Sequence, residues 1–405
     1  MIEIVIVGGG AAGFFAAIAA ARANEHCGVS LFERSSQFLS KVRISGGGRC
    51  NVTHALFDLR MFTARYPRGE RELISTFHRF SAHDTVTWFE ARGVSLKREA
   101  DGRMFPITNS SETIVKCLMD EAKAAGVRLF TRKGIESARV RAAGFDLKLN
   151  DDSSVACDRL LLATGGARSA VGAEIARSLG HTIEPPVPSL FSLHVSAPWL
   201  RSLPGISVSD VQLSVEKLRE RGPFLITHDG VSGPAILRLS AWGARTLHAM
   251  NYHFPLRVNW IPNMSEAALR AEFRSRRKTQ PNKRVINSPI DTLPARLWEK
   301  LVSNARISPD VIWTSLSRES INSLVRQLRN TELEVHGKSL NKDEFVTCGG
   351  VRLREINFKT MESRVTPNLY FAGELLDIDG ITGGFNFQAA WTTGWIAGHA
   401  MAGVS

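Results

Sequence analysis

A glycine-rich turn between an apolar strand and an apolar helix constrains the fold of this chain more than any other feature. Residues Gly8-Gly9-Gly10-Ala11-Ala12-Gly13 form a G-x-G-x-x-G pattern after a predicted strand, Ile2–Val7, and before a predicted helix, Phe14–Ala23. In this pattern the first glycine permits a tight turn, the second lets the backbone approach a pyrophosphate, and the third lets helix and strand pack closely. The helix N-terminus then offers amide donors to an anion.

An acidic residue at the expected distance strengthens this prediction. Glu33 follows the last glycine of the pattern by about 20 residues, at the end of a second predicted strand, Val29–Phe32. A carboxylate there binds the ribose hydroxyls of a dinucleotide and disfavours a 2′-phosphate. The segment therefore predicts a dinucleotide site on a parallel sheet, with the backbone at Gly10 beside the pyrophosphate.

Further elements of the α/β type follow along the chain. The apolar periodicity of Glu112–Ala125 predicts a helix, with Ser110 or Ser111 as its N-cap, and Val127–Thr131 and Arg159–Ala163 predict two more parallel strands. Between them, Phe145–Leu149 and Val155–Cys157 predict a small hairpin.

The character of the sequence changes near residue 185. Pro185, Pro186 and Pro188 indicate a linker. Short alternating runs over 191–260 then predict an antiparallel β module, and 264–329 reads mainly as helix. After about residue 340 the α/β pattern returns and ends in a helix, Phe387–Met401. We therefore expect residues 1–189 and 341–405 to form one nucleotide-binding domain, with 190–340 inserted in it.

Three other segments rich in glycine favour contact with a ligand. The first holds Gly46, Gly47 and Gly48 just before Arg49, because three consecutive glycines suit close backbone approach better than packing. The second is Ala163-Thr164-Gly165-Gly166, at the end of a predicted strand. The third, Phe371 to Gln388, contains Gly373, Glu374, Asp379, Gly383 and Gly384 and leads into the final helix. The alternatives are an ordinary flexible loop for the first segment and a simple helix entry for Gly383-Gly384.

Together these segments resemble one family of bacterial FAD-binding flavoproteins. The chain is similar to the aminoacetone-oxidase-like family, which also includes 3-dehydro-bile-acid reductases. The resemblance runs from end to end and is carried by five stretches, Gly8–Gly13, Ile44–Thr53, Gly102–Pro106, Thr227–Ala235 and Thr360–Gly398. It implies an α/β fold with a glutathione-reductase-like FAD-binding Rossmann domain, an inserted β-barrel module and a small helical domain at about 264–329.

The resemblance also implies a set of FAD contacts. It assigns the pyrophosphate to the first glycine turn and the adenosine ribose to Glu33. It places the loop Gly46–Asn51 and the segments near the C-terminus around the ribityl chain and flavin ring. The full expected set is Gly8, Gly10, Ala12, Gly13, Glu33, Arg34, Lys41, Gly46, Gly47, Gly48, Arg49, Cys50, Asn51, Ile135, Ala163, Thr164, Gly165, Gly373, Glu374, Asp379, Gly383, Gly384, Asn386 and Phe387.

Two polar residues beside the second glycine loop are the candidates for catalysis. Arg49 could clamp an anionic substrate and His54 could donate a proton. The alternatives are a phosphate contact for Arg49 and a structural hydrogen bond for His54. For Cys50, a buried thiol packed under the loop is favoured over a nucleophile.

The cysteine spacing and the N-terminal sequence exclude several classes of protein. The five cysteines include no C-x-x-C pair and the histidines have no ligand spacing, so we expect neither a dithiol relay nor a metal site. The chain has no long apolar run and begins directly with a strand, which favours a cytoplasmic protein. A second dinucleotide fingerprint is absent, so any NAD(P)H would bind only transiently as an electron donor.

The net charge of +12 leaves the partner open. The densest basic run, Arg270–Arg284, has no interleaved aromatic residues, so a solvated surface is favoured over contact with nucleic acid. The leading hypothesis is an FAD-dependent oxidoreductase acting on an unidentified small organic substrate. The alternatives are an RNA-associated flavoprotein and a non-catalytic flavin sensor.

Overall fold

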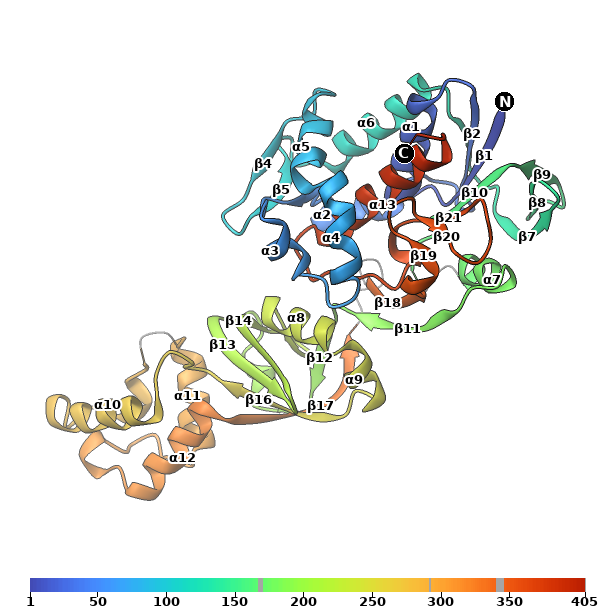
Figure 1. The fold of residues 1–405 in the computed structure, drawn as a ribbon. Coiled ribbons are helices and arrows are strands. Elements are labelled where there is room, and N and C mark those ends of the chain that lie inside the picture. The colour runs from blue at the N-terminus through green and yellow to red at the C-terminus, as the bar shows by residue number, and fades with distance from the viewer. Residues whose placement is uncertain (167–169, 291–292, 340–345, 405) are drawn as a thin grey trace. The chain divides into compact units, whose positions relative to one another are not determined.

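The chain divides into two compact units, each described by itself. The computed structural model describes residues 1–166, 170–290, 293–339 and 346–404. Unit 1 comprises Met1–Pro188 and Lys342–Ser405, and unit 2 comprises Ser189–Asn341. The two ends of the chain therefore build one unit, and the middle of the chain builds the other (Figure 1).

Unit 1 is organised around a seven-stranded sheet in the order β19-β20-β21-β10-β1-β2-β6. Strand β1 lies inside the sheet and pairs in parallel with β2 and β10, while β6 and β21 extend the parallel part. The burial of Ile4, Val5 and Ile6 fits a strand covered on both faces. The strands are β1 (Ile2–Val7), β2 (Cys27–Phe32), β6 (Arg128–Phe130), β10 (Arg159–Leu162), β19 (Ile356–Asn357), β20 (Glu362–Ser363) and β21 (Leu369–Phe371).

Two helices from opposite ends of the chain pack side by side in unit 1. They are α1 (Ala11–Ala23) and α13 (Phe385–Met401) (Figure 1). A Cβ atom at Gly394 would lie 2.3 Å from the Ala12 carbonyl oxygen, and one at Gly398 would lie 2.4 Å from that of Ala16. The absence of side chains at these two positions therefore lets the helix backbones approach closely.

The remaining elements of unit 1 confirm most of the sequence predictions there. The predicted helix is α6, and the Ser110 hydroxyl accepts a hydrogen bond from the Glu112 amide as its cap. The predicted hairpin is β8 and β9, joined by an unpredicted third strand, β7. These elements are α2 (Ser40–Gly48), β3 (Thr53–His54), α3 (Leu59–Thr63), α4 (Glu70–Arg79), α5 (Ala82–Glu90), β4 (Leu96–Arg98), β5 (Arg103–Pro106), α6 (Ser111–Ala124), β7 (Ile135–Arg141), β8 (Gly144–Leu149), β9 (Ser154–Cys157), α7 (Ala170–Ser178), β11 (Ile183–Ser189) and β18 (Val346–Val351).

The linker predicted from Pro185, Pro186 and Pro188 lies at the boundary between the two units, as expected, but it forms a strand and not an irregular connection. These prolines lie in β11, which pairs with β18 in a two-stranded sheet. Proline lacks an amide donor, so in a sheet it is tolerated on an edge whose amides would face solvent. Pro185 and Pro186 are exposed, which fits such an edge. The backbone of β18 also lies close here, since a Cβ atom at Gly349 would be 2.5 Å from the Pro185 carbonyl oxygen.

Unit 2 contains the expected β-barrel. Six strands close in the order β12-β15-β14-β13-β16-β17. Alternating buried and exposed residues in β13 match a wall with one face toward a core. The elements are β12 (Ser192–Val195), β13 (Ser207–Val215), β14 (Leu218–Ile226), β15 (Gly230–Ser232), α8 (Pro234–Trp242), α9 (Ala244–Ala249), β16 (Phe254–Asn259), α10 (Glu266–Thr279), α11 (Ala295–Asn304), α12 (Arg318–Arg329) and β17 (Thr331–Ser339).

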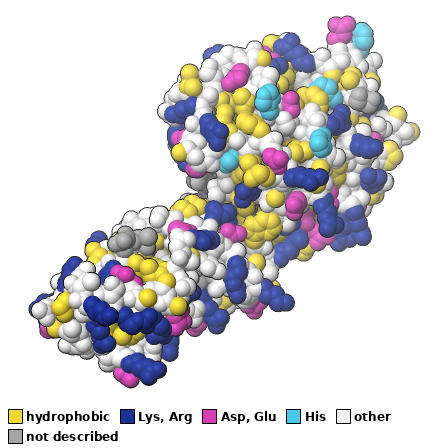
Figure 2. Space-filling model, turned by 60° about the vertical axis from the view of Figure 1, so that its left-hand side comes forward, with side chains coloured by type: hydrophobic (Ala, Val, Ile, Leu, Met, Phe, Trp, Pro, Cys, Tyr) yellow, Lys and Arg dark blue, Asp and Glu magenta, His cyan; other side chains and the backbone are white. Residues whose placement is uncertain are grey.

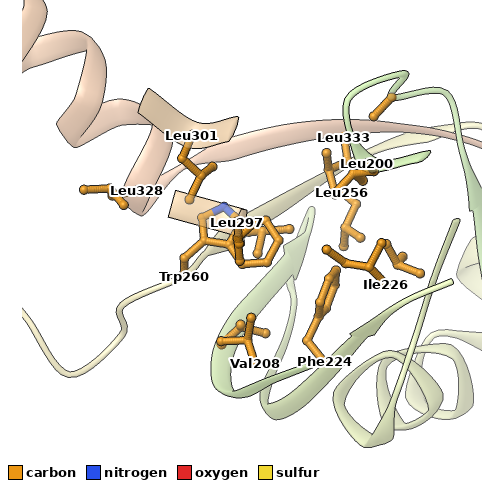
Figure 3. Packing of buried hydrophobic residues seen from close by; sticks show 14 of the residues in the cluster. Leu200, Val208, Phe224, Ile226, Leu256, Trp260, Leu297, Leu301, Leu328 and Leu333 are labelled. Carbon is orange, nitrogen blue, oxygen red and sulfur yellow. The ribbon is translucent and has the colours of Figure 1, made fainter. Parts of the chain in front are cut away.

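The barrel and the helices α10–α12 share one hydrophobic core. Trp260, at the end of β16, lies beside Leu297 of α11, while Phe224 and Ile226 come from the barrel wall (Figure 3). The Trp260 indole nitrogen donates to the Thr331 hydroxyl at 2.8 Å, so the ring is fixed at this junction. The predicted helical segment therefore packs as an extension of the barrel core.

Two kinds of feature are not found in the described part of the chain. None of the described helices combines the length and apolarity needed to cross a membrane. Among the same residues, no group of three or more His, Cys, Asp or Glu side chains is arranged to hold a metal ion.

Candidate functional site

The turn between β1 and α1 has the geometry of an anion site. Gly10 is the N-cap residue, and neither a side-chain cap nor an acidic residue occupies the first turn of α1. The amides of that turn are therefore available to a ligand. A Cβ atom at Gly13 would lie 2.0 Å from the Gly8 carbonyl oxygen, whereas one at Gly10 would meet no atom within 4 Å. Gly13 is thus required for packing, and Gly10 borders open space.

Glu33 is held against the same turn. One of its carboxylate oxygens accepts the Gly9 amide at 2.8 Å, and the other accepts the Ser35 amide at 2.8 Å. These bonds fix the carboxylate at the end of β2 and leave lone pairs for additional donors. The arrangement fits the predicted contact with ribose hydroxyls.

We expect Glu33→Ala to weaken FAD binding by about 10- to 100-fold, because hydrogen bonds to a charged group contribute about 1.5–3 kcal/mol. Titration of the apoprotein with FAD, followed by flavin fluorescence, measures the change. Glu25→Ala, at an exposed carboxylate before β2, is the matched control and should bind normally. Equal FAD affinities of the two variants would show that Glu33 does not contact the cofactor.

Two further predicted contacts lie beyond the end of β2. The side chain of Arg34 covers Gly134, where a Cβ atom would lie 2.9 Å from Arg34 Cγ. Ile135 follows at the start of β7 and its side chain is buried. Only its backbone could therefore face an adenine ring, as the family resemblance implies.

The end of β10 lies next to the first glycine turn. The Ala163 amide donates to the Val7 carbonyl at 2.8 Å, which places Thr164 and Gly165 beside Gly8. The Thr164 hydroxyl is buried and has no hydrogen-bond partner among the described residues. A Cβ atom at Gly165 would meet nothing within 4 Å. The open space therefore lies at Gly165, whereas the Thr164 hydroxyl is turned toward Gly172 of α7, where a Cβ atom would lie 1.9 Å from it.

The second glycine loop forms the distorted end of α2. Gly46, Gly47 and Gly48 all have positive φ, and Cβ atoms at Gly47 and Gly48 would meet nothing within 4 Å. Arg49 follows, with a nitrogen 2.7 Å from Glu99 and its guanidinium 4.0 Å above the Phe105 ring. The charge of Arg49 is therefore already matched by Glu99.

We expect Cys50 in the native protein to resist alkylation. Its side chain is fully buried, and burial raises the pKa of the thiol to about 12, so only about one thiol in ten thousand would ionise at pH 8. Iodoacetamide treatment at pH 8 followed by peptide mass spectrometry tests this. The half-exposed Cys27 and a sample unfolded in guanidinium serve as references. Rapid native labelling of Cys50 would contradict the buried assignment.

Asn51 joins the second glycine loop to the start of α13. With its amide oriented to satisfy both neighbours, it donates to the Thr53 carbonyl at 3.1 Å and accepts the Gly384 amide at 3.0 Å. Gly384 is the N-cap of α13, whose first turn has no side-chain cap and no acid. Phe387 in that turn stacks on Trp391, with ring centroids 5.5 Å apart. A second uncapped helix N-terminus therefore lies at this loop.

An ion pair connects α2 with the end of β21. Lys41 pairs with one oxygen of Glu374, and the other oxygen accepts the Thr347 amide at 2.9 Å. Gly373 lies next to α1, since a Cβ atom there would be 3.0 Å from the Ala12 Cβ. The two glycine-rich regions are therefore linked through residues predicted from sequence.

Two of the predicted residues are engaged within the protein. Asp379 is completely buried and forms an ion pair with Arg68. The Asn386 side chain exchanges two hydrogen bonds with the Gly380 backbone, each 2.9 Å. Their side chains shape the loop before α13, and any contact of theirs with a ligand is in addition to these bonds.

His54 lies at this loop as a stacked imidazole. Its ring is 4.9 Å from the Phe385 ring and nearly parallel to it, and Nε2 is 3.0 Å from the Asp101 carbonyl oxygen. Because that oxygen can only accept, Nε2 carries the proton and Nδ1 presents a lone pair. Nδ1 is buried without a partner among the described residues, and burial lowers the pKa of the ring. A neutral His54 can accept a proton at Nδ1 but cannot donate one from it.

The residues of unit 1 fit a dinucleotide carrying a planar ring. Cβ atoms at Gly10, Gly47, Gly48 and Gly165 would meet no protein atom within 4 Å. Positive φ accounts for glycine at the last three positions, whereas at Gly10 neither packing nor the backbone conformation requires it. Two uncapped helix N-termini supply amide donors. Amide donors at helix N-termini suit the negative charge of the FAD pyrophosphate and of the reduced flavin ring.

Sequence reasoning missed three supporting residues because their partners are distant in the chain. Arg68 pairs with Asp379, and the Tyr66 hydroxyl donates to the Phe385 carbonyl at 2.6 Å. The Thr53 hydroxyl donates to Gln388 at 2.6 Å, also below the start of α13. No local pattern marks such pairs, although buried polar residues beside a glycine turn are a usable signal.

Comparison with known proteins places these features in a family. The model of the HI0933-like protein Rossmann domain matches residues 2–400. The 3-dehydro-bile acid delta(4,6)-reductase of Clostridium scindens is 30% identical, over 99% of both chains. The ribosomal RNA dihydrouridine synthase of Escherichia coli is also 30% identical, over 97% of this chain and 96% of that protein. The structure of a 3-ketosteroid-delta4-(5alpha)-dehydrogenase from Rhodococcus jostii shares the fold, with a TM-score of 0.52, 17% identity and coverage of 99% and 97%.

Proposed function

This chain belongs to the family of the HI0933-like protein Rossmann domain, and from that membership we propose the reaction that it catalyses. It is an FAD-dependent oxidoreductase. We propose that it reduces a carbon–carbon double bond conjugated with a carbonyl group. The observation that carries this proposal is the chemistry shared by the two relatives at 30% identity, since each name describes such a reduction on a different scaffold.

The proposed reaction adds two hydrogens across the double bond. A hydride joins the carbon farther from the carbonyl and a proton joins the nearer carbon. FAD, held non-covalently, supplies the hydride when reduced. The glycine turn before α1 binds its pyrophosphate, Glu33 binds the ribose, and the first turn of α13 faces the ring. These roles are supported by the open space at Gly10 and Gly47.

Arg49 and His54 are the side chains proposed to act on the substrate. Arg49 pairs with Glu99, and Arg103 pairs with both Glu99 and Asp101, so the charges of this cluster balance. Arg49 would therefore act on a carbonyl through a remaining N–H donor and not through an excess of charge. His54, as a neutral ring, would accept a proton or a hydrogen bond at Nδ1. The proton for the substrate then comes from solvent.

We propose a small organic substrate as the first candidate and NAD(P)H as a transient electron donor. The absence of a second dinucleotide fingerprint supports weak donor binding. Calorimetry with NADPH should therefore give a dissociation constant well above 1 μM. Submicromolar affinity would reveal a dedicated nicotinamide site and overturn this part of the proposal.

A uracil base within RNA is the second candidate substrate. Its ring also contains a carbon–carbon double bond conjugated with a carbonyl, so the same chemistry applies. The net charge of +12 favours this candidate over a neutral metabolite, because phosphate groups attract a basic protein.

The two compact units suggest separate roles in cofactor binding and substrate recognition. We propose that unit 1 is the FAD-binding domain, built from 1–189 and 341–405, and that the barrel with its helices, at 190–340, is an inserted domain that recognises the substrate. Expression of residues 189–341 alone tests the boundary. A cooperative unfolding transition in that fragment is expected because its core is continuous, and an unfolded fragment would reject the assignment.

The reaction is tested with reduced enzyme under anaerobic conditions. Flavin should first appear in the supernatant after acid precipitation and run as FAD on chromatography. Dithionite-reduced protein is then mixed separately with 2-cyclohexenone, androst-4-ene-3,17-dione and protein-free ribosomal RNA. We expect reoxidation of the flavin and a gain of two hydrogens in at least one of these compounds, seen by mass spectrometry. Reoxidation by oxygen alone, with none of the three reduced, would reject the proposed reaction.

A further inference from the structure

The positive charge of the chain is concentrated in the helical part of unit 2. Residues 262–330 contain 13 Lys and Arg against six Asp and Glu, which accounts for seven of the twelve net charges in about a sixth of the chain. Figure 2 shows Lys and Arg side chains gathered on one face of this part. A charge excess this local requires its own explanation.

Within the run Arg270–Arg284, three exposed basic residues have neither an ion pair nor a side-chain hydrogen bond among the described residues. They are Arg274 and Lys278 of α10 and Lys283 in the turn that follows. The other basic residues of the run are engaged within the protein. Arg270, Arg276 and Arg284 pair with Glu266, Glu272 and Asp310, and Arg277 donates to the Trp313 carbonyl. Arg274, Lys278 and Lys283 are therefore the basic residues of the run that remain available to a partner.

The helix itself gains little from this arrangement. Arg274 lies four residues before Lys278, so two like charges are neighbours on one face, whereas the charge of Arg270 is matched by Glu266. Each such pair destabilises a helix by about 0.2–0.5 kcal/mol. The dipole at the helix C-terminus favours Lys278 but does not reach Arg274. A bound polyanion would remove this repulsion.

The basic face rests on a fixed support. Leu269 and Phe273 anchor α10 in the core, and Ser265 caps its start. Arg277 donates to the Trp313 carbonyl at 3.1 Å, which ties the last turn to the segment before α12. The face is therefore presented without a need for ordering when a partner binds.

The composition of the face favours phosphate groups as its ligand over a lipid membrane and over nucleic-acid bases. The apolar residues of α10 are turned into the protein, so the helix has no apolar side to insert into a membrane. Among the described residues of 262–330, none is a strongly exposed large hydrophobic side chain on which a base could stack. Lys and Arg alone bind the nucleic-acid backbone without reading its sequence.

We propose that this face, defined by Arg274, Lys278 and Lys283, docks the phosphate backbone of a structured RNA. The inference rests on the second candidate substrate proposed above. It assigns substrate capture to α10 of unit 2 and leaves the hydride chemistry to unit 1. Binding should be independent of sequence and should weaken steeply as salt rises.

The test compares two triple variants with the same change in net charge. One is Arg274→Glu/Lys278→Glu/Lys283→Glu. The control is Arg71→Glu/Lys123→Glu/Arg139→Glu, at three exposed basic residues of unit 1 without ion pairs among the described residues. Gel-shift titration of the FAD-loaded protein against protein-free ribosomal RNA is repeated from 50 to 200 mM salt. We expect at least a tenfold loss for the α10 variant, a fall of about 2–3 in its logarithmic salt slope, and less than twofold change in the control.

Several outcomes would overturn the proposal. They are equal losses in both variants, no RNA binding by the unmodified protein, or binding to vesicles of 70% phosphatidylcholine and 30% phosphatidylglycerol in place of RNA. A neutral variant, Arg274→Gln/Lys278→Gln/Lys283→Gln, replaces the acidic one if that variant unfolds. FAD content and reduction of 2-cyclohexenone should be unchanged in all of them. Loss of RNA binding alone is thereby distinguished from failure of the proposed reaction.

Discussion

Gly10→Val is expected to give a folded protein that purifies without FAD. Gly10 has an extended backbone, with φ −94° and ψ −166°, and an added Cβ atom would meet nothing within 4 Å. Valine can adopt this conformation, so the free energy of unfolding of the apoprotein should change by less than about 1 kcal/mol. The side chain would instead fill the space left for the pyrophosphate. We expect FAD affinity to fall at least about 100-fold, or by about 2.7 kcal/mol.

Gly13→Val is the matched control in the same turn. A Cβ atom at Gly13 would lie 2.0 Å from the Gly8 carbonyl oxygen, so the first turn of α1 would have to move. This variant should lose both FAD and stability, whereas Gly10→Val should lose FAD alone. Circular dichroism, thermal unfolding and flavin absorbance of the two proteins separate these results. A yellow Gly10→Val protein with unchanged affinity would show that the pyrophosphate lies elsewhere.

Arg68→Met is expected to cause the largest loss of stability among single changes near the site. Asp379 is fully buried, and Arg68 is its partner on a segment 311 positions away in sequence. Removing the guanidinium leaves a buried carboxylate without its compensating charge, which typically costs about 3–5 kcal/mol. Chemical denaturation followed by tryptophan fluorescence should show an earlier first transition in this variant.

A double variant separates the charge effect from a packing effect. In Arg68→Met/Asp379→Asn the buried charge is also removed, so most of the lost stability should return. Arg128→Met, which breaks the exposed pair with Glu3, should cost less than about 1 kcal/mol. If the double variant is as unstable as Arg68→Met alone, packing around the arginine matters more than the ion pair.

Local patterns were sufficient to predict the nucleotide-binding half of the fold. The strand, glycine turn, helix and strand from Ile2 to Phe32 form as predicted, because their periodicity and turn residues are contained in one short segment. The hairpin of β8 and β9 and the barrel strands follow the same logic of alternation. The prolines of β11 misled the prediction because pairing with β18, distant in sequence, decides that segment.

In the candidate site, side-chain partners that are distant in sequence could likewise not be predicted. The sequence identified Asp379 and Asn386 but not the use of their polar groups by Arg68 and the Gly380 backbone. His54 was predicted as a proton donor, and its contact with the Asp101 carbonyl, which makes Nδ1 an acceptor, depends on the fold of β3 against β5. Residue types were therefore predictable, and protonation and pairing were not.

Because α13 packs on α1, unit 1 cannot complete its fold until the C-terminal helix has been synthesised. Helix α1 ends at Ala23 and its partner begins at Phe385, so at about 5–20 residues per second roughly 20–70 seconds of translation separate them. Unit 2 is contiguous in sequence and can fold in that interval. The apolar residues of α1 that contact α13 stay uncovered until the last segment of the chain has been synthesised. We therefore expect cofactor loading to follow release from the ribosome. Chains that stall before residue 385 should be left with an exposed first helix, a substrate for chaperones and proteases.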